Sequence, residues 1–320
     1  MDRKPAAQAF ALPLAPPVRK RPQGIGVLMS WNSLPALVLD LDNSVRRIAD
    51  SEVRRPLQDW QESVRYGCSL RELGRLEKHL TLPPEHGCLF LGSGDYHHLS
   101  LIPLKRLSAS GEAFEIVVCD NHPDNMRYPF GIHCGSWIYW ACRLPAVSHV
   151  HVIGITSADI TWSHAWENYL TPFLARRLTY WSIGPDAPWL GWLGRRQYCR
   201  RSETADELLA AFADRLATAR RIYLSIDKDV FRQDLIRTNW DQGVFEKRHL
   251  AQLIQACAGK LTGVDITGEI SHYEYKGIFK KLLTRLDTQV ELDISRLPAW
   301  QSQQHLFNLE ILELLKQAGY

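Results

Sequence analysis

The feature that most constrains the fold of this chain is an alternation of short apolar runs with longer helical patterns, which begins near residue 35. Each apolar run is rich in β-branched and aliphatic residues and ends in a small or acidic residue. This alternation is typical of strand and helix units that build a mainly parallel sheet with helices on its faces. The predicted strands are residues 36–41, 88–91, 115–119, 149–155, 180–183, 221–226 and 261–266.

Helical patterns fall between the strands and are clearest at residues 204–220 and 248–258, where apolar residues recur at steps of three and four. Ser202 and the polar residues after it predict the N-terminal cap of the first of these helices. Residues 305–319 predict a final docked helix. The sequence shows no internal repeat and no low-complexity linker, so we expect a single three-layer α/β/α domain over residues 24–320. A flexible, Pro-rich basic arm is expected at residues 1–23.

Composition and charge exclude several classes of function. A chain of 320 residues that is 45% hydrophobic and 23% charged is a packed globular protein, and not a collagen-like or disordered one. The net charge of +3 is too small to indicate a nucleic-acid or anionic-membrane partner. We therefore expect a small-molecule substrate, with no nucleic-acid and no membrane partner.

Cysteine usage and the beginning of the chain favour the cytoplasm. The seven cysteines are scattered and form no CxxC pair, which predicts neither a disulfide framework nor a thiolate zinc site. No run of eighteen apolar residues occurs, and the prolines at 13, 16 and 17 spoil a secretory leader. A mitochondrial transit peptide is the alternative, which Asp2 and the same prolines weaken.

Acidic and imidazole groups are bunched where two of the predicted strands end. Strand 115–119 is followed by DNHPD at residues 120–124, and strand 221–226 is followed by DKD at residues 227–229. In an extended chain, residues two apart project to the same side, so each segment directs its acidic and imidazole groups toward one point. Ligands of open parallel sheets bind beyond the carboxyl ends of the strands, where both segments are expected to lie.

Four carboxylates that crowd together require compensating positive charge, because like charges a few ångströms apart repel strongly in a partly desolvated site. Two divalent cations are the natural remedy. Carboxylate oxygens and imidazole, without thiolate, suit Mn²⁺ better than structural zinc. A pair of such ions lowers the pKa of water toward neutrality, so hydrolysis is the expected reaction class.

A third strand end supplies GSGDYHH at residues 92–98, where glycines allow a sharp turn. Either His97 or His98 is expected to complete the metal shell. Spacing alone does not decide between the two.

These three segments resemble the signatures of the ureohydrolase (arginase/agmatinase) superfamily, which are GGDHS, DAHxD and SxDxDxxDP. Their counterparts here are GSGDYHHLS, DNHPD and SIDKDVFRQD, and the resemblance spans roughly residues 88 to 270 in the family's order. It implies an arginase-like fold and two Mn²⁺ ions per chain. The ligands that it implies are His97 or His98, Asp120, His122, Asp124, Asp227 and Asp229, with Asp120 and Asp227 shared between the ions. Spacing within the family pattern favours His97.

Three further matches imply roles in substrate handling. GIHCG at residues 131–135 resembles the family's NxHG segment, which gives His133 the role of proton shuttle to the departing amine. VDITGE at residues 264–269 resembles the late DxxE stretch, which gives Glu269 the contact with a substrate guanidinium. GITSAD at residues 154–159 is similar to the family's GxRxxD strand end, which makes Asp159 a candidate ligand of a substrate amine.

Departures from the family pattern concern the substrate more than the metal shell. Thr156 stands where the family usually has arginine, and the prolines that follow the second DxD segment and the late glutamate are absent. The loop between Asp124 and His133 is also several residues shorter than in arginases. Arginine itself is therefore in doubt, and we expect cleavage of a linear C–N bond in some guanidino, amidine or amide compound.

Other interpretations remain open from the sequence. Asp40 and Asp42 in the segment 37–44, LVLDLDNS, follow a predicted strand as in haloacid-dehalogenase-like phosphatases, where the first aspartate attacks phosphorus. A catalytically inactive metal-binding scaffold is a second alternative. The segment 180–201, rich in Trp, Gly, Pro and Arg, predicts an elaborated surface loop or a contact in a homo-oligomer, and nucleic-acid stacking is the less favoured interpretation.

Overall fold

The computed structural model describes residues 34–83, 85–278, 280–282 and 292–320. The predicted arm at residues 1–23 lies outside these residues. Within them, the fold is built on a nine-stranded parallel sheet with the order β2-β1-β4-β11-β10-β5-β7-β8-β9. The strands are β1 (Leu37–Asp40), β2 (Val53–Pro56), β4 (Leu89–Ser93), β5 (Phe114–Cys119), β7 (Val147–Ile155), β8 (Leu178–Ile183), β9 (Cys199–Ser202), β10 (Ile222–Asp227) and β11 (Leu261–Glu269).

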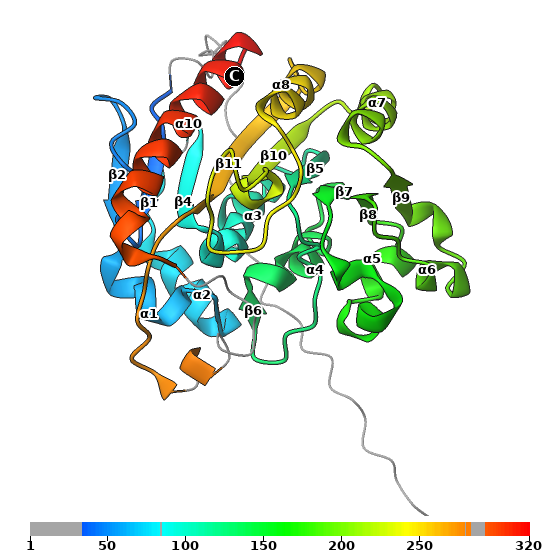
Figure 1. Ribbon diagram of the computed structural model, residues 1–320, viewed down its shortest axis with the longest axis horizontal. Helices are drawn as coiled ribbons and strands as arrows, with labels where there is room; N and C mark the ends of the chain where they lie inside the picture. Colours follow the sequence, from blue (N-terminus) through cyan, green and yellow to red (C-terminus); the bar gives the residue numbers. More distant parts are fainter. Residues whose placement is uncertain (1–33, 84, 279, 283–291) are drawn as a thin grey trace, which may run out of the picture.

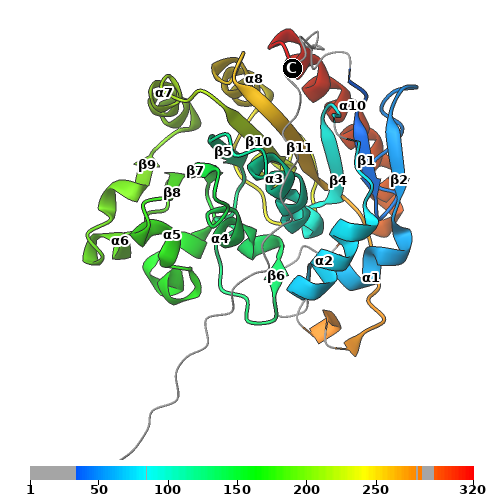
Figure 2. The same ribbon diagram turned by 180° about the vertical axis from the view of Figure 1, so that it is seen from behind.

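Helices cover both faces of the sheet, which gives the three layers that the alternation predicts (Figure 1). They are α1 (Gln61–Val64), α2 (Leu70–His79), α3 (Leu101–Ser108), α4 (Trp137–Ala141), α5 (Thr171–Leu174), α6 (Trp189–Trp192), α7 (Ala205–Leu216), α8 (Lys247–Ala256) and α10 (Leu297–Gln317). One hydrophobic core lies between the sheet and α2, α3 and α4, and the other lies between the sheet and α7, α8 and α10. Figure 2 views the molecule from the side of α3.

Helix α7 shows how local sequence sets these layers. The Thr204 side chain accepts a hydrogen bond from the backbone N–H of Glu207, so the cap lies two residues after the predicted Ser202. Leu208, Phe212 and Leu216 recur at the helical repeat and are buried against the sheet. Each such side chain contributes about 1.5–3 kcal/mol relative to an exposed one.

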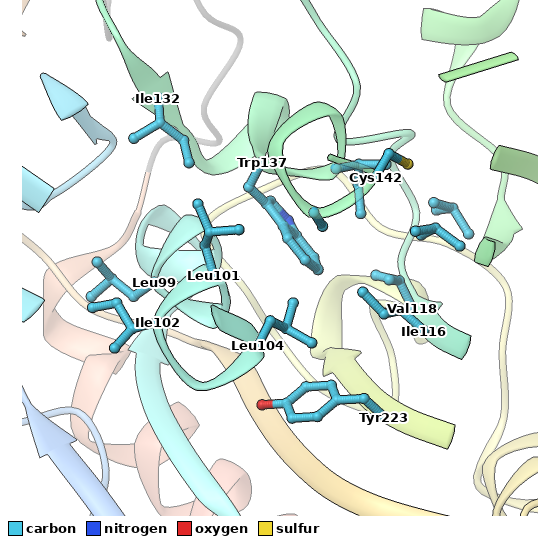
Figure 3. Close-up of a cluster of buried hydrophobic side chains, with 14 of the residues drawn as sticks. Leu99, Leu101, Ile102, Leu104, Ile116, Val118, Ile132, Trp137, Cys142 and Tyr223 are labelled. Carbon is cyan, nitrogen blue, oxygen red and sulfur yellow. The ribbon is translucent and has the colours of Figure 1, made fainter. Parts of the chain in front are cut away.

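The core on the other face surrounds an indole that also touches the candidate site. Figure 3 shows Leu101 and Leu104 of α3 and Val118 of β5 around Trp137 of α4. A short antiparallel pair, β3 (Gly67–Cys68) with β6 (Ile132–His133), lies beyond the edge of the main sheet. Gly67 faces the Cβ atom of His133 so closely that a side chain there would come within 2.6 Å.

The segment 180–201 is more regular than the predicted loop. It contains the end of β8, helix α6 and the beginning of β9, so it closes one edge of the sheet. Two of its four arginines form ion pairs within the chain: Arg196 with Asp186, and Arg201 with Glu203.

Candidate metal centre

The three predicted motifs meet at the carboxyl edge of the central strands. β4, β11, β10 and β5 are parallel neighbours, so the segments that follow them emerge side by side. A cavity of about 730 Å³ lies at this edge. Six of the predicted ligands line it: His97, Asp120, His122, Asp124, Asp227 and Asp229.

A first group of donors consists of His97, Asp120 and Asp124, all buried, whose ligand atoms lie within 4.8 Å of one another. The Nδ1 atom of His97 is 3.1 Å from Oδ2 of Asp120 and 2.9 Å from Oδ2 of Asp124. It is also 3.4 Å from Oδ2 of Asp227. One imidazole nitrogen therefore faces three carboxylates from two different segments, the one that follows β5 and the end of β10.

A second group shares Asp120 with the first and adds His122 and Asp229. The Nδ1 atom of His122 is 3.0 Å from Oδ2 of Asp229 and 3.6 Å from Oδ1 of Asp120. Because Asp120 belongs to both groups, its carboxylate lies between two adjacent donor sets. This arrangement matches the shared role that the family resemblance implies for Asp120.

Backbone conformation holds these side chains in place. The carboxylate of Asp120 accepts a hydrogen bond from the N–H of His122, and that of Asp227 accepts one from the N–H of Asp229. Asp124 adopts a positive φ of 46°, a conformation that costs an ordinary side chain energy, and its Oδ2 atom accepts a hydrogen bond from the Trp137 indole at 2.6 Å. The indole thus links the carboxylate to the core.

The electrostatics of the cluster show an excess of negative charge. Burial, together with the charge of Asp120, raises the pKa of Asp124 to about 7 and that of Asp229 to about 6. Burial and the charge of Asp229 raise the pKa of Asp227 well above its usual value. For His97, burial opposes the imidazolium, but hydrogen bonds with Asp120 and Asp124 outweigh it and raise its pKa. Within the described residues, no lysine or arginine forms a salt bridge with these four carboxylates.

The donor set fits a pair of hard or borderline divalent cations. It offers carboxylate oxygens and two imidazoles and no thiolate, which is the chemistry that Mn²⁺ accepts. Cations would relieve the repulsion that raises the carboxyl pKa values. Asp227 lies outside the two compact donor groups and is placed by its contact with His97.

A further layer of hydrogen bonds supports His97. Its Nε2 atom is 2.9 Å from Oγ of Ser225, whose hydroxyl donates to Oδ1 of Asp265 at 2.5 Å. Asp265 also accepts a hydrogen bond from the Tyr223 hydroxyl at 2.7 Å. Partners of this kind fix the orientation of a metal-binding imidazole.

His133 lines the cavity and is held by aromatic rings and a backbone hydrogen bond. Its ring stacks on Tyr66 with the centroids 5.6 Å apart, and the ring of Tyr128 meets it edge-on at 4.4 Å. The N–H of Gly135 donates to Nδ1 at 2.8 Å, which leaves the proton of the neutral ring on Nε2. Burial lowers the pKa of His133 to about 3, so the ring is neutral at pH 7.

Two predicted site residues lie elsewhere. His98 is fully buried and belongs to neither donor group, whereas His97 belongs to the first. Glu269 does not line the cavity: its Oε1 atom accepts hydrogen bonds from Lys228 at 2.5 Å and from Asn308 at 2.6 Å. The prediction that Glu269 contacts the substrate is corrected by this buried ion pair.

Strand alternation explains the correction for Glu269. Gly268 precedes it in β11 with a φ of +87°, and a Cβ atom there would lie 2.5 Å from Oδ1 of Asp227. The residue of β11 that faces the cluster is therefore one that has no room for a side chain. Glu269 projects to the other side, toward Lys228.

Several cavity residues were not found from the sequence. Asp159 lines the cavity as the prediction requires, but so do Tyr66, Tyr128, Trp240 and Asp241, which belong to no motif. Their positions depend on where separate loops pack.

Asp40 and Asp42, the nucleophile candidates of the phosphatase alternative, lie outside this cavity. Asp42 is buried against Arg65 and also accepts hydrogen bonds from the hydroxyls of Ser44 and Ser271. Asp40 pairs with Arg54 at 3.2 Å. Both aspartates therefore have cationic partners within the chain.

Cavity volume alone does not identify the site. A larger cavity of about 1190 Å³ lies at the β7–β9 edge of the sheet. Near it, Glu115 pairs with both His151 and Arg215, and Arg196 pairs with Asp186. The acidic groups there are matched by basic ones, whereas the 730 Å³ cavity has an unmatched acidic cluster.

Comparison with known proteins agrees with this architecture. No family model matches the sequence. An uncharacterized protein of Thermotoga maritima is 27% identical over 215 residues, which are 67% of this chain and 70% of that protein. The proclavaminate amidino hydrolase of Streptomyces clavuligerus covers 92% of this chain over 98% of its own, with a TM-score of 0.52 and 15% identity.

A second solved structure gives the same result. The formimidoylglutamase of Bacillus subtilis covers 95% of this chain over 97% of its own, with a TM-score of 0.51 and 11% identity. Identities this low establish the fold alone. The chain has the α/β fold of the ureohydrolases, as its motifs predict. Among the described helices, none combines the length and apolarity needed to cross a bilayer.

Proposed function

We propose that this protein is a hydrolase that uses two Mn²⁺ ions to cleave a linear C–N bond in a guanidino, amidino or related amide compound. The observation that carries the proposal is the pair of donor groups that share Asp120 inside one cavity. The fold, shared with an amidino hydrolase and a formimidoylglutamase, supports the same class of reaction.

The residues that would hold the ions are His97, Asp120, His122, Asp124, Asp227 and Asp229. Two bound divalent cations would supply the Lewis acidity that makes water a nucleophile near neutral pH. The chain positions the donors before any substrate arrives, because backbone N–H groups orient Asp120 and Asp227 and an indole orients Asp124.

His133 is the residue that we assign to the leaving nitrogen of the substrate. Because Gly135 occupies Nδ1, the neutral ring presents Nε2–H to the cavity, where it donates a hydrogen bond to the leaving nitrogen. Tyr66 and Tyr128 prevent rotation of the ring, so this donor stays in one orientation. Tyr66 itself has a positive φ of 65°, a strained conformation placed directly beside His133.

The substrate enters through the outer part of the cavity. Aromatic and acidic residues line this part, among them Tyr128, Phe130, Trp166 and Asp159. A carboxylate such as Asp159 is suited to hold an amino group on the tail of the substrate. The proposed substrate is therefore a small organic cation with an apolar segment.

A panel of guanidino, amidino and amide compounds incubated with the Mn²⁺-loaded protein tests the proposal. We expect release of urea, amine or ammonia from at least one compound, and a fall of about 10²–10⁴-fold in His133→Gln with its metal content unchanged. His149→Gln is the matched control, since His149 is a histidine of β7 outside this cavity. Full metal loading with no turnover of any compound would favour the scaffold alternative.

A further inference from the structure

The end of β11 leaves the cavity without the carboxylate that a cationic substrate requires beside the metal cluster. Glu269 is 1% exposed and is held by Lys228 and Asn308, and Gly268 fills the position that faces Asp227. A planar cation that is hydrolysed next to the cluster needs a nearby acceptor for its N–H groups, because burial of such a cation without a partner is costly. Another residue of the cavity has to supply this acceptor.

Three carboxylates line the cavity outside the metal-ligand set: Asp159, Glu167 and Asp241. Glu167 faces His164 at 3.2 Å. Only Asp241 among these three contacts a residue of the cluster, with its Oδ1 atom 2.8 Å from Nε2 of His122. Its side chain is 58% exposed, so an edge of the carboxylate stays open to the cavity.

The loop that carries Asp241 is fixed in place. The side-chain amide of Asn121 donates both to the backbone carbonyl of Asp241 and to its Oδ2 atom, at 3.2 and 3.0 Å. The Trp240 indole donates to Asp95, and the N–H of Gly243 donates to the carbonyl of Asp229 at 2.7 Å. The carboxylate is thus held in place before ligand binding, which lowers the entropic cost of contacting one.

Trp240 adds an aromatic surface beside the same carboxylate. Its ring lines the cavity and meets His122 edge-on, with the centroids 6.0 Å apart. A planar cation can lie against an indole face while its N–H groups reach a neighbouring carboxylate. A neutral amide gains neither of these two interactions to the same degree.

We propose that Asp241, beside Trp240, is the carboxylate that binds the cationic nitrogens of a guanidino or amidino substrate and makes the site prefer such a cation to a neutral amide. This inference rests on the proposed function, because it places the substrate next to the metal cluster. The role differs from mere support of His122, since an asparagine at position 241 retains an oxygen that can accept the His122 Nε2–H but lacks the charge.

The test is calorimetric titration of the Mn²⁺-saturated protein with methylguanidinium and with its neutral analogue N-methylurea. We expect the wild-type chain to prefer methylguanidinium by about tenfold or more, the size of a charge-assisted hydrogen bond. Asp241→Asn is expected to keep its Mn²⁺ and to reduce the preference below about threefold. Asp234→Asn, in the same loop but paired with Arg232 and outside the cavity, is expected to keep the wild-type preference.

Three results would overturn the inference: no preference in the wild-type chain, an unchanged preference in Asp241→Asn, or loss of Mn²⁺ from that variant, which would show that Asp241 acts only through His122. Failure of the proposed function gives a different result, because a wild-type chain that binds no Mn²⁺ is recognised in the metal titration that precedes the ligand titration.

Discussion

Two buried acidic clusters lie near the carboxyl edge of the sheet, and they obtain their positive charge in different ways. In the arginine-centred cluster, Asp42 and Asp95 face the guanidinium of Arg65, which is 2% exposed. In the metal-ligand cluster, the salt bridges of the four aspartates within the described part of the chain are with the imidazoles of His97 and His122. The first cluster is completed by the chain itself, whereas the second requires cations from solution.

This difference separates two motifs that look alike in the sequence. Both DLD at residues 40–42 and DKD at residues 227–229 follow apolar strands and place acidic groups at strand ends. Asp42 meets an arginine, but Asp227 meets His97 and other carboxylates. In this chain, the DxD segment that forms a salt bridge with a buried arginine lies outside the metal-ligand cluster, and the one that contacts His97 belongs to it.

The largest effect is expected from removal of the cation in the arginine-centred cluster. Arg65→Met leaves Asp42 and Asp95 buried without their shared partner, which costs about 3–5 kcal/mol of unfolding free energy. Urea denaturation measures this loss. Arg75→Met is the matched control, because the Arg75–Glu72 pair is exposed and contributes at most about 0.5 kcal/mol. A loss of less than about 1 kcal/mol of unfolding free energy in Arg65→Met would show that Asp42 and Asp95 do not depend on Arg65 for their positive charge.

A smaller effect is expected from the buried ion pair between Lys228 and Glu269. Glu269→Gln leaves Lys228 buried without its counter-ion, and we expect a loss of about 2–3 kcal/mol. The loss is smaller than for Arg65→Met because a lysine can release its proton, and burial already lowers the pKa of Lys228. Glu310→Gln, which breaks the exposed pair with Lys247, is the control for denaturation experiments. A selective rise in KM without destabilisation would restore Glu269 as a substrate ligand.

The pH dependence of metal binding sharpens the contrast between the clusters. Folding raises the pKa of Asp124 from 3.8 to about 7 and that of Asp229 to about 6, so these carboxyls stabilise the metal-free fold at low pH and lose that contribution as the pH rises through 6 and 7. Protons and Mn²⁺ compete for the same oxygens. We therefore expect Mn²⁺ affinity to rise between pH 5.5 and 7.5, by up to about tenfold per pH unit for each proton released.

Calorimetry in buffers of different ionisation enthalpy counts the released protons. When it binds Mn²⁺ at pH 6, Asp124→Asn is expected to release fewer protons than the wild-type chain, even if its affinity for Mn²⁺ is weaker. An affinity that is independent of pH across this range would show that the cluster is already charged before the metal binds.

The smallest effect is expected at Asp40. Asp40→Asn removes one partner of Arg54, which keeps its contact with Glu52 at 2.9 Å, so we expect a loss below about 1 kcal/mol. Metal content and C–N hydrolysis are expected to stay at wild-type levels. A second assay measures phosphate release from para-nitrophenyl phosphate in the presence of Mg²⁺. Release by the wild-type chain that disappears in Asp40→Asn would support the phosphatase alternative.

Much of the fold could be predicted because buried parallel strands are continuous apolar runs. All seven predicted strands occur, with ends that differ by at most three residues. The two missed strands of the main sheet, β2 and β9, have the sequences VRRP and CRRS and lie at its two edges, where exposure to solvent permits charged residues. Periodicity carries no signal for such strands.

The same distinction between local pattern and long-range packing applies to the residues of the candidate site. Residues within contiguous motifs, such as Asp120 and Asp227, could be placed because one strand end determines their direction. Glu269 could not, since a register difference of one residue in β11 reverses the face on which a side chain lies. Asp241 and Tyr66 depend on long-range packing of loops, which a single sequence does not encode in any local pattern.

The central claim is that the six-residue cluster binds two divalent cations from solution. These ions supply the positive charge that Arg65 supplies to Asp42 and Asp95. Metal analysis of purified protein after saturation with Mn²⁺, paired with Asp227→Asn, tests it most directly. We expect two Mn²⁺ per wild-type chain and loss of at least one ion, together with C–N hydrolysis, in the variant. A wild-type chain that binds no Mn²⁺, or a variant with both ions retained, would contradict the account.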